Sequence, residues 1–147
     1  MITTGTASIR SRSHESQTMR DTLLLIGRVL LVVMFIKSGF DKFFSLEGTA
    51  AYIGSAGLPM PSVLAPLTAI AEFGLGLAIL IGYQTRIAAF ALAAFALLTI
   101  PFFHAYWNMT DQARMLNQIM AMKNVSLAGA FLLLAGAGAG RYSVDRS

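Results

Sequence analysis

The stretch RVLLVVMFIKSGFDKFF, from Arg28 to Phe44, decides the fold class because it is apolar enough to form part of a membrane span. It also carries four charged side chains, which are Arg28, Lys37, Asp41 and Lys42. Charged groups inside a bilayer are costly, so they normally face other helices, a watery cavity or the membrane surface. Their placement therefore indicates which face of this span looks inward.

The composition of the whole chain agrees with a membrane protein. The 147 residues are enough for one domain, and 56% hydrophobic with 12% charged residues is far from soluble usage. The net charge is +4, but the basic residues are scattered, so we expect no nucleic-acid partner. The absence of cysteine excludes disulfides, thiolate-held clusters and c-type haem. We expect no haem, iron–sulfur cluster or metal.

Four segments are long and apolar enough to cross a bilayer, whose core of about 30 Å needs roughly 20 helical residues. The expected fold is all-α, an integral membrane four-helix bundle. Pro101 should kink the third span or end its regular part. The four spans are residues 22–44, 62–82, 85–107 and about 110–140.

The segments outside these spans complete the predicted organisation. Residues 1–20 are rich in serine and threonine and are expected to be a flexible cytoplasmic tail. Residues 21–141 form the four-helix domain, and residues 142–147 a short cytoplasmic C-terminal tail. A glycine- and proline-containing connection joins the first two spans.

The lysine and arginine residues predict the orientation in the membrane. Six of them fall on the side of the two termini, and fewer on the opposite side, which places both termini in the cytoplasm. The six are Arg10, Arg12, Arg20, Arg86, Arg141 and Arg146. Aromatic residues of the third span then form an interfacial belt on the other side, namely Phe102, Phe103, Tyr106 and Trp107.

Helical periodicity divides the charges of the first span into two sets. At about 100° per residue, Arg28 and Lys42 fall on one face together with Phe35 and Gly39. Lys37 falls on the opposite face with Asp41 one turn later, a spacing typical of an ion pair at the membrane surface. Arg28 and Lys42 are therefore predicted to face the bundle interior.

Glu72 lies near the middle of the second span, where a lone carboxylate would be costly. Arg28 could pair with it, because a long arginine can bridge a small difference in depth. That pair could be purely structural, or it could line a ligand or proton site, and both alternatives require the same geometry. Asn124 of the fourth span is expected to bond to the first or second span.

Two further polar residues carry simpler interpretations. Lys123 is interpreted as a snorkelling lysine. His104 lies in the aromatic belt and is interpreted as a satisfied interfacial histidine rather than a catalytic base or ligand. No set of histidine and carboxylate residues has the spacing of a metal site.

Taken together, these features resemble the DoxX family of small four-span bacterial membrane proteins. The resemblance covers about residues 20–140, through the early arginine, SGFDKF at Ser38–Phe43, GLP at 57–59, AEFGLGLAILIGYQTR at 71–86 and KN at 123–124. Carried over position by position, the family pattern selects four site residues, which are Arg28, Lys42, Glu72 and Asn124.

The resemblance implies a component of a quinone- or quinol-linked oxidoreductase system in the bacterial inner membrane, with members tied to quinone and thiol stress. Glu72 would then be the catalytic proton acceptor, and a non-covalently bound quinone the ligand. Besides the lipid bilayer, an oxidoreductase subunit and a second copy of the chain are candidate partners. The alternative is a non-catalytic scaffold that recruits a partner enzyme; a transporter is disfavoured because no inverted repeat is evident.

Overall fold

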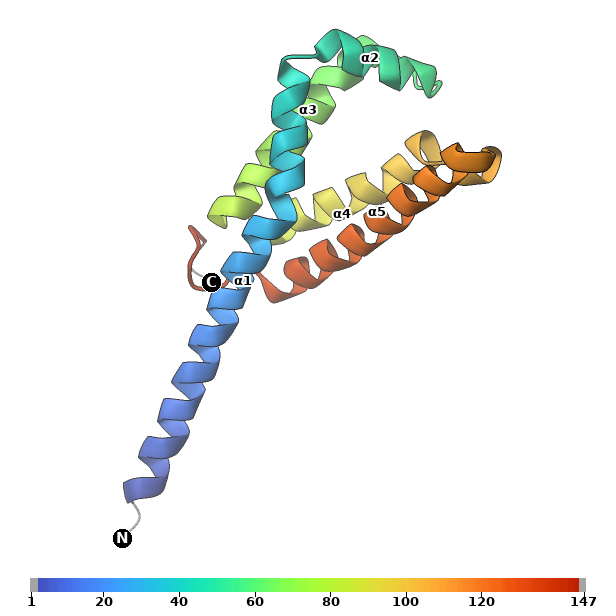
Figure 1. The fold of residues 1–147 in the computed structure, drawn as a ribbon. Coiled ribbons are helices and arrows are strands. Elements are labelled where there is room, and N and C mark those ends of the chain that lie inside the picture. Colours follow the sequence, from blue (N-terminus) through green and yellow to red (C-terminus); the bar gives the residue numbers. More distant parts are fainter. Residues whose placement is uncertain (1–2, 146–147) are drawn as a thin grey trace.

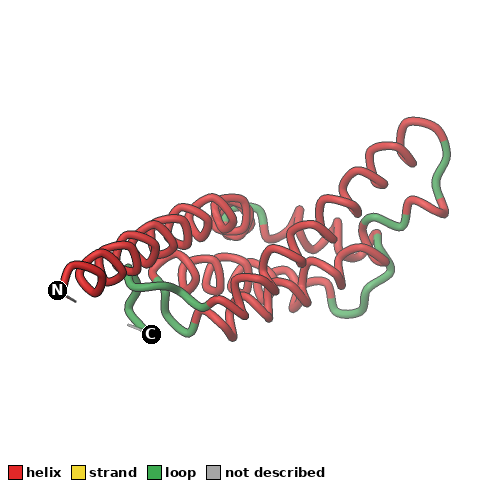
Figure 2. Tube along the Cα trace, turned by 90° about the horizontal axis from the view of Figure 1, so that it is seen from below, coloured by secondary structure: helices red, strands yellow, loops and turns green. Residues whose placement is uncertain are grey.

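The computed structural model describes residues 3–145, and their backbone is helical over most of its length (Figures 1 and 2). Four of the helices are long and apolar enough to cross a membrane, which confirms the predicted all-α class and the four spans. The helices are α1 (Thr3–Phe43), α2 (Leu46–Ser55), α3 (Pro61–Ile81), α4 (Thr85–Phe103), η1 (Tyr106–Asn108) and α5 (Asp111–Ala137).

The four long helices form a ring in which each helix contacts two neighbours. α1 packs along α3, α3 contacts α4, α4 packs along α5, and a few contacts between α5 and α1 close the ring. Figure 1 shows the two main pairs, α1 with α3 and α4 with α5, diverging toward the end that carries α2. The α1–α5 seam is therefore the least closely packed side of the bundle.

The apolar core fills one half of this ring. It joins the C-terminal halves of α1, α3 and α5 to the N-terminal half of α4. Phe35 of α1 meets Phe131 of α5 edge to face, with ring centroids 5.2 Å apart. Many of the buried α4 positions are alanine, which lets neighbouring backbones approach closely.

The segments at the two ends of the chain contain structure of their own. α1 begins at Thr3, so most of the segment expected as a flexible tail continues the first helix and projects beyond the bundle (Figure 1). The C-terminal segment folds back onto the α3–α4 turn, where the amides of Val144 and Asp145 donate to the carbonyls of Ile81 and Gly82. The ends of these predicted tails, residues 1–2 and 146–147 with Arg146, lie outside the described residues.

The connection between the first two spans contains a short helix, which its glycine and proline residues did not predict. Residues 46–55 form α2, which packs mainly on α3 at the end of the bundle opposite the C-terminus (Figure 1). The third span loses its regular helix at Phe103, two residues after Pro101, and continues as η1, in line with the predicted effect of the proline.

Candidate functional site

Gly39 sets the distance between α1 and α3. A Cβ at this position would lie 2.5 Å from the backbone nitrogen of Phe73 and 2.9 Å from the carbonyl oxygen of Ala69. Any side chain there would force the two backbones apart, so glycine permits the close contact. The same contact aligns Glu72, one residue before Phe73, with the end of α1 that carries Lys42.

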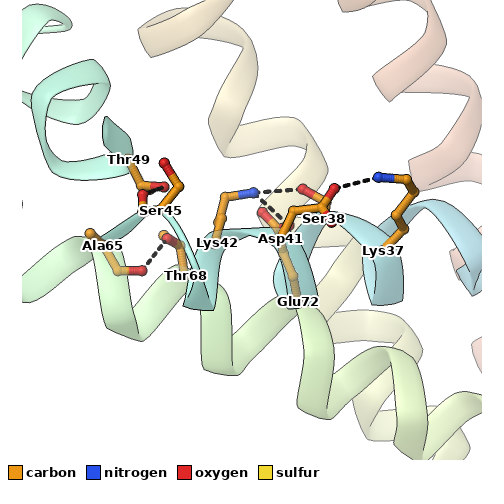
Figure 3. Close-up of polar contacts among 9 residues, drawn as sticks. All are labelled: Lys37, Ser38, Asp41, Lys42, Ser45, Thr49, Ala65, Thr68 and Glu72. Atoms are coloured by element: carbon orange, nitrogen blue, oxygen red, sulfur yellow. Dashed lines mark hydrogen bonds and ion pairs between the residues drawn. The ribbon is translucent and has the colours of Figure 1, made fainter. Parts of the chain in front are cut away.

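Lys42 and Glu72 form an ion pair across this α1–α3 contact (Figure 3). Lys42 Nζ lies 2.9 Å from Glu72 Oε2 and donates a second bond, of 2.6 Å, to Ser38 Oγ one turn earlier on α1. The Glu72 side chain is 8% exposed and that of Lys42 is 24% exposed. The charges are therefore largely removed from solvent, and each is balanced by the other.

The predicted division of charges on the first span is confirmed. Arg28, Phe35 and Gly39 are buried on one face, with Lys42 partly buried. Lys37 and Asp41 form the expected i,i+4 ion pair on the outer face, where both side chains are mostly exposed (Figure 3).

The predicted pairing of Arg28 with Glu72 is wrong. Arg28 is 1% exposed, but its Nη2 donates to the carbonyl oxygen of Tyr142 in the folded-back C-terminal segment. The antiparallel register explains the difference, because Gly39 lies against Ala69 and Phe73 while Arg28 lies beside Gly82, at the far end of α3. Glu72 is thus about three helical turns from the level of Arg28 along α1.

Asn124 supplies a second polar contact, between α5 and α4. Its Nδ2 donates to Thr99 Oγ1 at 2.8 Å, and the threonine hydroxyl in turn donates to the carbonyl of Ala96. Asn124 is 9% exposed, so its side chain lies inside the bundle. Its predicted partner is wrong, since the bond goes to the third span and not to the first or second.

His104 and Tyr52 close the end of the bundle nearest α2. His104 Nδ1 is 3.1 Å from Asn117 Oδ1, so the histidine has a polar partner as expected. Tyr52 of α2 stacks on Phe103 of α4, with centroids 5.1 Å apart. This stack connects α2 to the α4–α5 pair.

These residues surround one cavity of about 270 Å³, located between the two helix pairs and beneath α2. Polar groups lie on both sides, the Lys42–Glu72 pair on one and the Asn124–Thr99 pair on the other. Aromatic and apolar side chains make most of the remaining wall. The lining residues are Met34, Phe35, Ser38, Lys42, Thr49, Tyr52, Ile53, Thr68, Glu72, Phe95, Ala96, Thr99, Phe103, His104, Lys123 and Asn124.

Three of the four predicted site residues are thus brought to one cavity, and the fourth, Arg28, is held at the opposite end of the bundle. Sequence reasoning missed Ser38, Thr99 and Tyr52. Ser38 could have been found from its position one turn before Lys42, and Thr99 as a hydroxyl within an apolar span. Tyr52 gave no such signal, because its role depends on where α2 lies.

The arrangement suits a small ligand that is mostly apolar and carries oxygen atoms. Ligand sites typically combine apolar walls with a few convergent polar groups, in volumes of roughly 300–1,000 Å³. Lys42 can donate to an oxygen of the ligand, and Glu72 can accept a proton. Within the described residues, no group of three histidine or carboxylate side chains could hold a metal ion.

Comparison with known proteins identifies the family. The DoxX family model matches residues 23–105. The Escherichia coli (strain K12) inner membrane protein YphA is 42% identical over 127 residues, which cover 86% of this chain and 91% of the relative. The inner membrane protein YqjF of the same organism is 41% identical over 128 residues, 87% of this chain and 93% of the relative. No solved structure matches the chain.

The similarity to both relatives extends over nearly their whole length. Both relatives are inner membrane proteins, and the four candidate membrane spans of this chain agree with that location. The chain therefore belongs to the DoxX family and is a multi-pass protein of the inner membrane.

Proposed function

We propose that this protein is the membrane component of a quinone- or quinol-linked oxidoreductase system, and that its cavity holds the quinone ring. The observation that carries the proposal is the Lys42–Glu72 pair at the wall of an otherwise mostly apolar cavity. An isolated ion pair would stabilise the bundle no better than apolar residues of the same size. A pair that lines a cavity can in addition donate a hydrogen bond to a ligand and accept a proton from it.

Each residue has a defined task in this proposal. Lys42 donates a hydrogen bond to one quinone oxygen, with Ser38 holding the ammonium group in place. Oxidation of a quinol releases two electrons and two protons. A redox subunit associated with the protein takes the electrons, and Glu72 accepts the protons in turn and returns each to water before the next.

The walls of the cavity support the same class of ligand. Phe35, Phe95 and Phe103 offer aromatic surface to a planar ring. Thr99 and Asn124 lie across the cavity from Lys42 and can bond to the second oxygen of the ring. A ligand with two oxygens on opposite edges of a flat apolar ring can bond to the polar groups on both sides of the cavity.

The test combines ligand binding with complementation of a deletion strain. Purified protein in lipid nanodiscs is titrated with 1,4-naphthoquinone, and saturable binding that weakens by about tenfold in Lys42→Met is expected. In the deletion strain, Glu72→Gln should accumulate in the membrane but fail to restore resistance to quinones. Asp41→Asn is the matched control, because Asp41 is a carboxylate on the outer face of α1.

Two results would contradict the proposal. One is the absence of saturable naphthoquinone binding by the wild-type protein. The other is full complementation by Glu72→Gln, which would favour the alternative function of a scaffold for a partner enzyme.

A further inference from the structure

Lys123 is a charged residue of the cavity that the proposed proton chemistry does not use. It lies near the middle of α5, the helix that runs from Asp111 to Ala137, and its side chain reaches the cavity wall. Its Nζ is 3.3 Å from the sulfur of Met120 and 3.8 Å from that of Met34. A thioether sulfur is a weak acceptor and carries no charge.

The charges around the cavity therefore do not balance. Lys42 is neutralised by Glu72, and His104 bonds to an uncharged amide. Among the described side chains, those of residues 14–145, Lys123 forms no ion pair. The lining therefore includes one exposed lysine whose charge no carboxylate of the described side chains balances.

The position of Lys123 also indicates how a ligand reaches the cavity. Met34 of α1 and Lys123 of α5 both line the cavity, and both are exposed on the outside of the bundle. They lie on either side of the α1–α5 seam, where the ring of helices has its fewest contacts. Lys123 Nζ and Met34 Sδ meet across this seam, so the ammonium group lies at the α1–α5 edge of the cavity, beside the outside of the bundle.

We infer that the ligand of this cavity is a monoanionic amphiphile, an apolar body bearing one ionised oxygen, which enters between α1 and α5 and binds Lys123 through that oxygen. The inference rests on the proposed function, and it specifies the substrate class as an acidic hydroxyquinone in its ionised form. A charge-assisted bond from Lys123 would replace the weak thioether contacts. The ligand would supply the negative charge that the described part of the chain does not provide there.

Matched probes separate charge from shape. 2-Hydroxy-1,4-naphthoquinone is ionised at neutral pH, whereas 1,4-naphthoquinone has the same ring and carbonyls without the charge. Binding to full-length protein in nanodiscs of zwitterionic lipid is measured by titration calorimetry. The ionised compound should bind the wild type at least about tenfold more tightly, the ratio expected for one charge-assisted hydrogen bond.

Variants at Lys123 test whether this residue is responsible. Lys123→Gln should abolish the preference, and Lys123→Arg should retain it because the positive charge is kept. Lys37→Gln is the matched control, since Lys37 is an exposed lysine of α1 that pairs with Asp41 outside the cavity. Far-UV circular dichroism and monodispersity of each variant show whether it has folded.

The outcomes distinguish this inference from the proposed function. Equal binding of the two quinones, or an unchanged preference in folded Lys123→Gln, would overturn the inference while leaving quinone binding intact. Laurate, an anion with a lipid-like body, is the third compound, and it tests whether the site binds an anionic amphiphile that is not a quinone. If laurate binds in a Lys123-dependent manner and neither quinone binds, the anion site stands and the quinone function fails. If none of the three compounds binds, both fail.

Discussion

Removal of one member of the Lys42–Glu72 pair should destabilise the protein far more than removal of both. Lys42→Met leaves a carboxylate that is 8% exposed without a partner, and Glu72→Leu leaves the lysine unpaired. The double variant Lys42→Met/Glu72→Leu leaves no charge at this contact. We therefore expect its stability to be close to that of the wild type.

The distance and the exposure of the pair set the magnitude. At the 2.9 Å separation, two unit charges attract by about 5 to 6 kcal/mol at an effective dielectric constant of about 20. Removal of one partner from a fully buried pair costs about 3 to 5 kcal/mol. Because Lys42 is 24% exposed, we expect about 2 to 4 kcal/mol for Lys42→Met and about 1 to 3 kcal/mol for Glu72→Leu. The double variant should lie within about 1 kcal/mol of the wild type.

The free energy of unfolding can be measured by titration with dodecyl sulfate in mixed micelles, followed by far-UV circular dichroism. The Lys37–Asp41 pair on the outer face provides the control cycle, with an expected coupling below about 0.5 kcal/mol. Additive effects of Lys42→Met and Glu72→Leu would refute the reasoning, because additivity means that the two charges do not interact in the folded bundle.

Three further predictions concern other parts of the bundle. Gly39→Ala should destabilise the fold by about 1 to 3 kcal/mol in the same micelle titration, because its Cβ would overlap the α3 backbone. Gly74→Ala, whose Cβ meets nothing within 4 Å, should not destabilise it. Arg28→Met removes the bond to Tyr142 and should speed trypsin cleavage after Arg141 by about tenfold; an unchanged cleavage rate would contradict this role. The excess of positive charge on the side of the two termini predicts that the C-terminus is cytoplasmic, so a C-terminal fluorescent protein should be active and a C-terminal alkaline phosphatase inactive. An active phosphatase fusion would contradict this orientation.

The two ends of the bundle use their polar residues differently. At one end, Arg28 holds the C-terminal segment, and Arg86 Nη1 donates to the carbonyls of Ala135 and Gly136 at the end of α5. At the other end, Lys42, Glu72 and Asn124 meet the cavity. The packed apolar core occupies the half of the bundle that includes the Phe35–Phe131 contact. Removal of the arginine contacts should therefore loosen the end of the bundle that carries the C-terminus, and removal of the Lys42–Glu72 or Asn124–Thr99 contacts should alter the wall of the cavity.

The sequence by itself determined the spans and the inward face of the first helix. Both follow from local patterns, since apolar length predicts a membrane helix and the spacing of Arg28, Gly39 and Lys42 places them on one side. The exposed Lys37–Asp41 pair follows from the same periodicity. Composition and spacing contain this information because each concerns residues on a single helix.

Only the tertiary structure decided which polar residues meet. The partner of Glu72 depends on the register between α1 and α3, which is fixed where Gly39 lets the two backbones touch. That register places Glu72 beside Lys42 and Arg28 beside Gly82. There Arg28 donates to the carbonyl of Tyr142 in the C-terminal segment. The relative height of two helices is set by their packing contacts and not by the pattern of either one. The cavity likewise depends on the packing of the helices, since its lining comes from all five α-helices.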